Sequence, residues 1–129
     1  MDYFEPKTVS DALALLARYG EQAKVIAGGT DVMVDIKYKE EPSCLINIKR
    51  IPGMDQIREN GGGLRIGPLV TIRSLETNSL VRERLPLLWE SCHQFASLQI
   101  RNTATIGGNV CRASPSGETL APLLVLEAK

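Results

Sequence analysis

Two short stretches of glycine and hydroxyl residues have the composition best suited to hold a ligand. Val25 to Asp31 reads VIAGGTD, and Thr105 to Asn109 reads TIGGN. Adjacent glycines let the backbone approach a ligand closely and aim several N–H groups at it, which is anion-binding chemistry. Two such stretches in one small chain can clamp a phosphate-bearing ligand from both sides.

The pattern alone leaves two interpretations open for each stretch. A glycine pair next to Asn or Thr is also a common turn former, and a turn is the more frequent explanation. Neither stretch matches Gly-x-x-x-x-Gly-Lys-Ser/Thr or Gly-x-Gly-x-x-Gly, the motifs of familiar phosphate loops. Spacing by itself therefore predicts a phosphate site only weakly.

Two charged residues beside these stretches also have alternative roles. Arg101 precedes the second stretch, where it would pair with a diphosphate or bond loop carbonyls and hold the turn; the structural role is favoured. Asp31 ends the first stretch, directly after Thr30, the expected cap of a helix. A capping role for Asp31 is favoured over a direct ligand contact.

The elements expected around the first stretch form a small parallel β-α-β unit. A capped helix is expected between Thr8 and Gly20. A strand over 24–27 then leads through the glycine pair into a helix over 31–38, and a second strand follows over 44–48. This order places the glycines where a strand delivers the chain to a helix N-terminus, whose free N–H groups favour a phosphate.

After a boundary at residues 51–53, the pattern predicts a β-hairpin followed by helices. The hairpin surrounds residues 59–63, whose three glycines are interpreted as an exposed turn rather than a phosphate loop. One of these helices is predicted to turn one face toward the core, formed by Leu87, Leu88, Ser91 and Phe95. Helices are expected to begin near Thr71, near Leu80, at Pro86, and at Glu118 or Thr119.

Composition argues against several functional classes. The chain has 129 residues, 43% of them hydrophobic, and a formal net charge of zero, which suits one ordinary globular core. No run of Lys or Arg indicates binding to nucleic acid or to a membrane surface, and no apolar run is long enough to cross a bilayer. The start lacks the layout of a secretory signal, so a cytoplasmic location is expected.

The cysteines and the single histidine do not have the spacing of a metal or iron–sulfur site. Cys44, Cys92 and Cys111 form no Cys-x-x-Cys pair, and each is expected to be a small buried hydrophobe. His93 is expected at a partly exposed helix position, four residues from Trp89, with no nucleophile to activate. We therefore predict no metal ligand and no catalytic residue.

Longer motifs resemble a known family. Four segments in order resemble the FAD-binding (medium) subunit of molybdenum hydroxylases. They are Ala27 to Asp31, Gln99 to Asn102, which runs into Thr105 to Asn109, and Ala113 to Pro115. This family includes the medium subunit of carbon monoxide dehydrogenase and the FAD domain of xanthine dehydrogenase. The likeness runs along the whole chain in order and corresponds to the N-terminal part of such subunits, which continue beyond the position of Lys129.

The resemblance implies an α+β fold of the PCMH type that binds FAD. Its implied parts are a small N-terminal β-α-β subdomain over residues 1–52 and a truncated second, mixed α/β subdomain over residues 53–129. The FAD diphosphate would lie between the two glycine stretches. The residues implied to contact FAD are Val25, Ile26, Ala27, Gly28, Gly29, Thr30, Asp31, Thr105, Ile106, Gly107, Gly108, Asn109, Ser114 and Glu118.

Two positions depart from the family pattern. Glu118 stands where relatives commonly have Asp a few residues after the Ser-Pro pair, and its added methylene lengthens the reach of the carboxylate. Arg112 stands where relatives often have a small or polar residue, so the pattern assigns it no role.

The resemblance also implies a function. Flavin subunits of this family take electrons from iron–sulfur centres in a small partner subunit and pass them through FAD to an acceptor, while a large subunit carries the molybdenum cofactor. The chain is thus expected to be an oxidoreductase component. Self-association is expected as well, because an N-terminal part alone leaves apolar surface and a sheet edge uncovered. The alternative is a flavin-free relative that acts only as an assembly or binding module.

Overall fold

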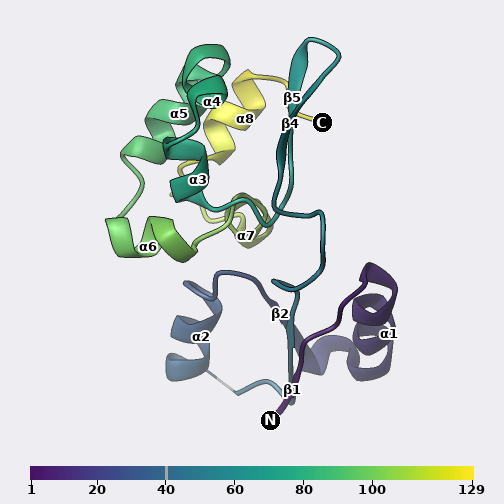
Figure 1. Cartoon of the computed structure of the whole chain (residues 1–129). Coiled ribbons are helices and arrows are strands. Elements are labelled where there is room, and N and C mark those ends of the chain that lie inside the picture. Colours follow the sequence, from purple (N-terminus) through teal and green to yellow (C-terminus); the bar gives the residue numbers. More distant parts are fainter. Residues whose placement is uncertain (40) are drawn as a thin grey trace.

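The computed structural model describes residues 1–39 and 41–129, which form an α+β fold (Figure 1). We call residues 1–52 the N-terminal part and residues 53–129 the C-terminal part. The N-terminal part contains β1 (Asp2–Phe4), α1 (Val9–Tyr19), the 3-10 turn η1 (Gly20–Gln22), β2 (Ala23–Ile26), α2 (Val32–Tyr38) and β3 (Cys44–Asn47). The C-terminal part contains β4 (Ile57–Asn60), β5 (Gly63–Ile66), α3 (Ile72–Glu76), α4 (Ser79–Arg84), α5 (Pro86–His93), α6 (Leu98–Thr103), α7 (Ile106–Arg112) and α8 (Leu120–Val125).

The N-terminal part is built on a three-stranded parallel sheet with the order β1-β3-β2. Strand β3 is central, so that Cys44 lies opposite both Asp2 of β1 and Ala23 of β2. The predicted β-α-β unit is confirmed, because β2 and β3 are parallel neighbours joined through α2. Strand β1 was not predicted, since three residues are too few to show the alternation that indicates a strand.

Helix α1 begins and ends where its sequence predicts. The Thr8 hydroxyl accepts the Asp11 N–H at 3.1 Å, and Gly20 adopts a φ of +54° just after the last helical residue. The buried residues of the N-terminal cluster are Ala12, Cys44, Ile46 and Ile51. The cluster therefore lies between the sheet and one face of α1.

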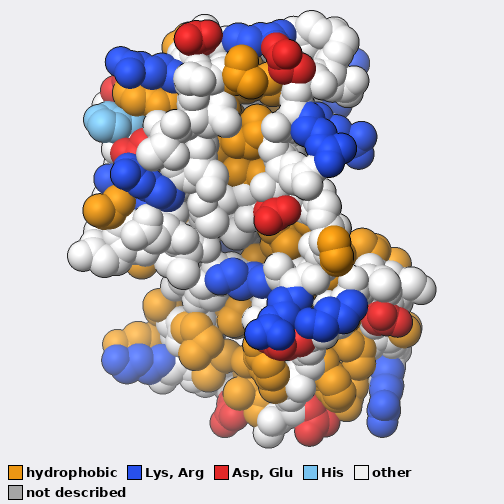
Figure 2. Space-filling model, in the orientation of Figure 1, with side chains coloured by type: hydrophobic (Ala, Val, Ile, Leu, Met, Phe, Trp, Pro, Cys, Tyr) orange, Lys and Arg blue, Asp and Glu red, His pale blue; other side chains and the backbone are white. Residues whose placement is uncertain are grey.

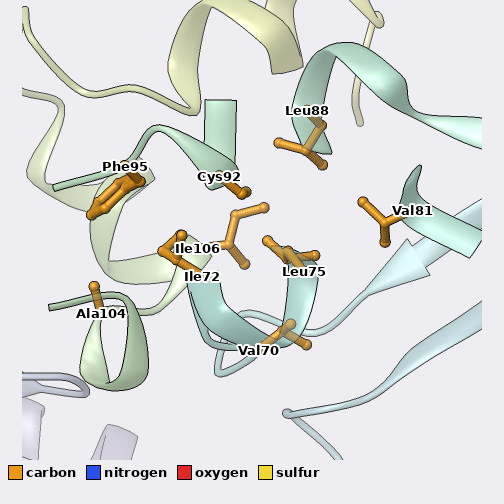
Figure 3. Close-up of a cluster of buried hydrophobic side chains, with 9 residues drawn as sticks. All are labelled: Val70, Ile72, Leu75, Val81, Leu88, Cys92, Phe95, Ala104 and Ile106. Atoms are coloured by element: carbon orange, nitrogen blue, oxygen red, sulfur yellow. The ribbon is translucent and has the colours of Figure 1, made fainter. Parts of the chain in front are cut away.

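The C-terminal part has its own cluster, surrounded by short helices (Figure 3). Its buried residues are Val70, Ile72, Leu75, Val81, Leu88, Cys92, Phe95, Ala104 and Ile106. Strands β4 and β5 form the predicted antiparallel hairpin, whose turn contains Gly61 and Gly62 with positive φ. The hairpin packs against the cluster through Ile57, Leu64 and Ile66.

The predicted inward face of α5 is partly wrong. Leu88 and Cys92 are fully buried and Phe95 follows them into the cluster, whereas Leu87 is 44% exposed. Adjacent residues of a helix point about 100° apart, so Leu87 faces outward when Leu88 faces the core.

Helix α6 was not expected, because residues 98–103 carry no apolar periodicity. Among the described residues, no helix is long and apolar enough to cross a membrane.

Candidate functional site

A cleft of about 490 Å³ lies between the N-terminal and C-terminal parts. In the space-filling view the outline of the molecule narrows between these parts (Figure 2). Both glycine stretches reach the cleft, one from β2 and α2 and the other from α7. The predicted residues that line it are Val25, Ala27, Gly28, Gly29, Thr30, Asp31, Thr105, Gly107, Gly108 and Asn109.

Four predicted site residues do not line the cleft. Ile26 packs beneath Gly29, and Ile106 is buried in the C-terminal cluster. Ser114 bonds the hydroxyl and the backbone N–H of Ser116 and so holds a turn, and Glu118 is exposed. Direct contact of these four with a ligand in this cleft is therefore not supported by their positions.

Eight further residues that line the cleft were not predicted from the sequence. Ile48 follows the end of β3, and the carboxyl ends of neighbouring parallel strands meet at one edge, so its place was predictable in principle. The others come from the packing of the two parts against each other, for which the sequence gives no local signal. The missed residues are Val32, Ile48, Pro68, Leu69, Phe95, Ala104, Cys111 and Arg112.

Residues 28–32 line the cleft, and we call their backbone N–H groups the N–H cluster. In residues 1–39 and 41–129, no protein acceptor bonds these groups; the next one, the Met33 N–H, bonds the Gly29 carbonyl at 3.0 Å. Unpaired N–H groups at the entry to a helix are donors for an anion. The first stretch therefore has the backbone arrangement that its sequence predicts.

The predicted capping of α2 is wrong. Asp31 occupies the N-cap position with helical backbone angles, and no side chain bonds a backbone N–H there. Because Asp31 is already helical, its side chain does not have the extended cap geometry that aims an oxygen back at the first turn. The consequence is that the first N–H groups of α2 stay available.

The two glycines of the first stretch satisfy different backbone requirements. A Cβ at Gly28 would lie 2.2 Å from the carbonyl oxygen of Thr103, so only glycine lets the two backbones come this close. Gly29 has a φ of +77°, a conformation that other residues rarely adopt. Gly28 thus lets the two parts approach, and Gly29 lets the chain turn into α2.

The second stretch is the capped start of α7 and not a turn or a stretch of free N–H donors, which corrects both interpretations of its sequence. The Thr105 hydroxyl accepts the Gly108 N–H at 3.1 Å. The N–H groups of Ile106 and Gly107 bond the carbonyls of Val70 and Pro68 at 3.0 and 2.9 Å. These donors are already paired, because the chain around Thr105 runs beside residues 68–71 and exchanges hydrogen bonds with them.

The Asn109 side chain holds the C-terminal helix in place. Its Oδ1 accepts the backbone N–H of Thr119 at 3.2 Å and also the Thr119 hydroxyl. Thr119 is fully buried, so these bonds satisfy polar groups that water cannot reach. Asn109 lines the cleft and at the same time connects α7 to the start of α8.

A buried carboxylate supports the wall of the cleft formed by Phe95. Glu76 accepts from Arg73 at 2.9 Å and from Arg101 at 3.1 Å, while Arg101 also donates to the carbonyls of Phe95 and Ala96 at 2.8 and 3.1 Å. Hydrogen bonding from Arg73, aided by the charge of Arg101, lowers the pKa of Glu76 despite its burial. Arg101 therefore has a structural role, although it holds the 95–96 turn and not the glycine stretch.

The single histidine completes this network. The His93 Nδ1 lies 3.1 Å from the Glu76 carboxylate, and its ring stacks on Trp89 with centroids 4.9 Å apart. The expected contact between Trp89 and His93 is confirmed, as is the exposure of His93. Its partner is a carboxylate inside a structural network, not a nucleophile.

An ion pair joins the helices that carry the two stretches. The Arg112 guanidinium bonds both Asp35 oxygens, at 2.5 and 3.3 Å, and Lys39 bonds Asp35 at 2.8 Å. These hydrogen bonds, that from Arg112 first, lower the pKa of Asp35 to about 2. The pKa of Arg112 is raised in turn.

The cysteines divide into two buried thiols and one exposed thiol. Burial raises the pKa of Cys92 to about 12 and raises that of Cys44. Cys111 is exposed and lines the cleft, so the expectation that it is buried is wrong: it lies on the cleft side of α7, not its core side. The described residues contain no group of three His, Cys, Asp or Glu placed to hold a metal ion.

Comparison with known proteins gives a consistent result along the whole chain. A family described as "FAD binding domain in molybdopterin dehydrogenase" matches residues 1–129. The carbon monoxide dehydrogenase medium chain of Hydrogenophaga pseudoflava is 38% identical over 98% of this chain and 45% of that relative. The xanthine dehydrogenase FAD-binding subunit of Escherichia coli O157:H7 is 35% identical over 98% of this chain and 44% of that relative.

Solved structures agree. The chain superposes on carbon monoxide dehydrogenase of Hydrogenophaga pseudoflava with a TM-score of 0.86 and 39% identity, covering 89% of this chain and 40% of that chain. Reconstituted CO dehydrogenase from Oligotropha carboxidovorans gives a TM-score of 0.88 and 33% identity, covering 92% and 42%. The chain thus spans less than half the length of these relatives. With its two glycine stretches meeting at one cleft, it belongs to the family of FAD-binding domains of molybdopterin dehydrogenases.

Proposed function

We propose that this chain binds FAD in the cleft and serves as the flavin-carrying component of a molybdenum hydroxylase-type oxidoreductase. The observation that carries the proposal is the N–H cluster of residues 28–32: these residues line the cleft, and their N–H groups have no acceptor in the described part of the protein. A diphosphate offers several charged acceptor oxygens, and hydrogen bonds to charged groups are the stronger kind.

The residues present fit such a ligand. Gly28 and Gly29 both line the cleft, where Gly28 lets the first stretch lie against residues 103–104 and Gly29 allows the turn into α2 that leaves the N–H groups unpaired. Pro68, Leu69 and Phe95 supply apolar surface in the same cleft, which suits the flat rings of a dinucleotide. The Thr30 hydroxyl adds a polar group next to the donors.

The second glycine stretch has a different part in this proposal. Its N–H groups are paired within the protein, so Gly107 and Gly108 would offer bare surface rather than donors. Asn109 keeps its side-chain N–H₂ for a ligand, because only its oxygen bonds Thr119. Of the two stretches, the first would therefore hold the diphosphate and the second would cover it.

Electron transfer follows from the cofactor and not from the side chains. FAD, when bound, supplies the chemistry of accepting and donating electrons, while the protein binds, orients and shields it from water. The similar proteins are named as medium chains or FAD-binding subunits of dehydrogenases. We propose for this chain that iron–sulfur centres of a small subunit deliver the electrons and that a large subunit holds the molybdenum cofactor.

Other features stay predictions. They are the division at residue 52, the cytoplasmic location and self-association. Self-association is supported by large apolar side chains on the surface, among them Leu13 at 59% exposure and Leu124 at 80%. The flavin-free alternative has less support, since an assembly module needs neither the N–H cluster nor the close approach of Gly28.

Titration with flavins tests the proposal. Purified chain is titrated with FAD, with FMN, which keeps one phosphate but lacks the adenosine, and with riboflavin, which lacks both the phosphates and the adenosine. Binding is followed by flavin fluorescence and calorimetry. We expect FAD to bind and riboflavin to bind at least about tenfold more weakly, because hydrogen bonds to a charged group are worth more than those to a neutral one. Equal affinity for FAD and riboflavin would refute the diphosphate site, and no binding by a folded chain would refute the proposed function.

A further inference from the structure

The walls of the cleft are held together by an ion pair outside the N–H cluster. Asp35 lies on α2, whose first turn contributes to the N–H cluster, and Arg112 is the last residue of α7, which carries the second glycine stretch. The guanidinium meets both carboxylate oxygens, which fixes the direction as well as the distance between two short helices.

No other side-chain polar contact joins the N-terminal part to the C-terminal part in the residues that the structure describes. Among the described residues, the Asp35–Arg112 pair supplies the only ion pair and the only side-chain hydrogen bonds between residues 1–52 and residues 53–129. A second contact between the two parts at the cleft is the close approach of Gly28 to the backbone of residues 103–104. The two contacts thus come from opposite ends of the segment 28–35.

Charged side chains near the Asp35–Arg112 pair favour the ionised state of both members. Asp31 lies one turn before Asp35 on α2 and also stabilises the charged form of Arg112. Lys39, one turn after Asp35, bonds the same carboxylate and neutralises part of its charge. Arg112 lines the cleft, although its guanidinium is already committed to Asp35.

We infer that the Asp35–Arg112 pair is an electrostatic latch that sets the width of the FAD cleft, with both members acting as positioning residues. The latch keeps α2 at a fixed distance from α7, so that the N–H cluster and the covering surface of α7 face the same ligand. Its role in affinity rests on the proposed function; its role in holding the two parts does not.

A different role for Arg112 makes the opposite prediction. If Arg112 instead bonds an FAD phosphate directly, Asp35 competes with the ligand for the guanidinium. Asp35→Asn would then release Arg112, remove a negative charge near an anionic ligand, and tighten FAD binding. If the pair is a latch, Asp35→Asn loosens the cleft and weakens FAD binding although the site becomes less negative.

The affinity experiment is a double-mutant cycle on the full chain. FAD dissociation constants are measured for wild type, Asp35→Asn, Arg112→Gln and the double variant. The matched control is Lys37→Gln, because Lys37 is an exposed cation of the same helix whose ammonium lies over the Tyr38 ring and not on Asp35. We expect each single variant to raise Kd about two- to fivefold, the double variant to be no weaker than the singles, and the control to match wild type. Tighter binding by Asp35→Asn, or additive losses, would overturn the latch.

A second readout needs no FAD. In a Cys111→Ser background, spin labels on cysteines placed at the exposed positions Glu21 and Glu83 report the distance between the two parts of the ligand-free chain. We expect Asp35→Asn to broaden this distance distribution, and about 1 M salt to broaden that of the parent chain to the same extent by screening the pair. Unchanged distributions would refute the latch, whereas a wild-type chain that holds its distance yet fails to bind FAD would refute only the proposed function.

Discussion

The backbone of Gly28 lies directly against the backbone of Thr103, so that a methyl group on Gly28 would sit 2.2 Å from the Thr103 carbonyl oxygen and 3.0 Å from the Cα of Ala104. These atoms are main chain and have no rotamer by which to move aside. The N–H cluster therefore reaches the C-terminal part only because residue 28 has no side chain.

Gly28→Ala is expected to separate the two parts and to weaken FAD binding. Relieving the clash means moving one backbone, so we expect at least about a tenfold rise in Kd and a loss of about 1–3 kcal/mol in unfolding free energy. Calorimetric titration and urea denaturation measure the two effects. Gly63→Ala is the matched control, because its new Cβ meets only the Asn60 carbonyl, at 3.7 Å. If Gly28→Ala binds FAD as Gly63→Ala does, the close approach has no part in the site.

Asn109 is expected to be required for the position of α8. Asn109→Ala removes the acceptor of two donors on the fully buried Thr119, which should lower the unfolding free energy by about 1–3 kcal/mol. Asn109→Asp keeps the acceptor oxygens and serves as the control. Amide hydrogen exchange should rise over residues 119–126 in the alanine variant alone, and equal protection in both variants would contradict the assigned role.

Stability at acid pH is expected to depend on Glu76. Its pKa in the folded protein lies below the ordinary 4.5, so its contribution is fully present above that pH and is lost as the pH falls through the lowered value. Glu76→Gln leaves Arg73 and Arg101 without their carboxylate and should cost about 1–3 kcal/mol near pH 7, less than a fully buried pair because Arg73 is partly exposed.

The gap between variant and wild type should close toward low pH. Urea denaturation of both proteins from pH 7 down to about pH 3 provides the measurement. A difference in unfolding free energy that stays constant over this range would show that Glu76 acts through packing and not through its charge.

The fold was predictable wherever the pattern is local. The helix capped by Thr8, the β-α-β unit and the hairpin with its glycine turn each depend on residues close together in sequence. The predictions failed where distant backbone decides. Gly107 and Gly108 have the composition of an anion-binding stretch or a turn in the sequence, and only the carbonyls of residues 68 and 70 show that the first N–H groups of α7 are already paired.

The candidate site could be predicted only in outline. Both glycine stretches were found from the sequence, because the glycine pairs, which alone are a weak signal, coincide there with the longer motifs of the family. Phe95 and Arg112 reach the cleft through contacts across the fold: Arg101 bonds the carbonyl beside Phe95, and Asp35 bonds Arg112 over a sequence separation of 77 residues. No periodicity or spacing rule connects positions so far apart.

Thiol labelling is expected to report directly on occupation of the cleft. Cys111 is exposed and lines the cleft, while Cys44 and Cys92 are buried with raised pKa values and thus form little reactive thiolate. A thiol reagent at pH 8 should modify only Cys111 in the native chain, and mass spectrometry of the peptides identifies the site. Saturating FAD should slow this reaction, because a ligand between the two stretches covers α7, whereas riboflavin at the same concentration should protect less. Labelling at an unchanged rate with FAD bound would place the flavin outside this cleft, since a ligand held by the N–H cluster cannot leave the facing surface of α7 equally open.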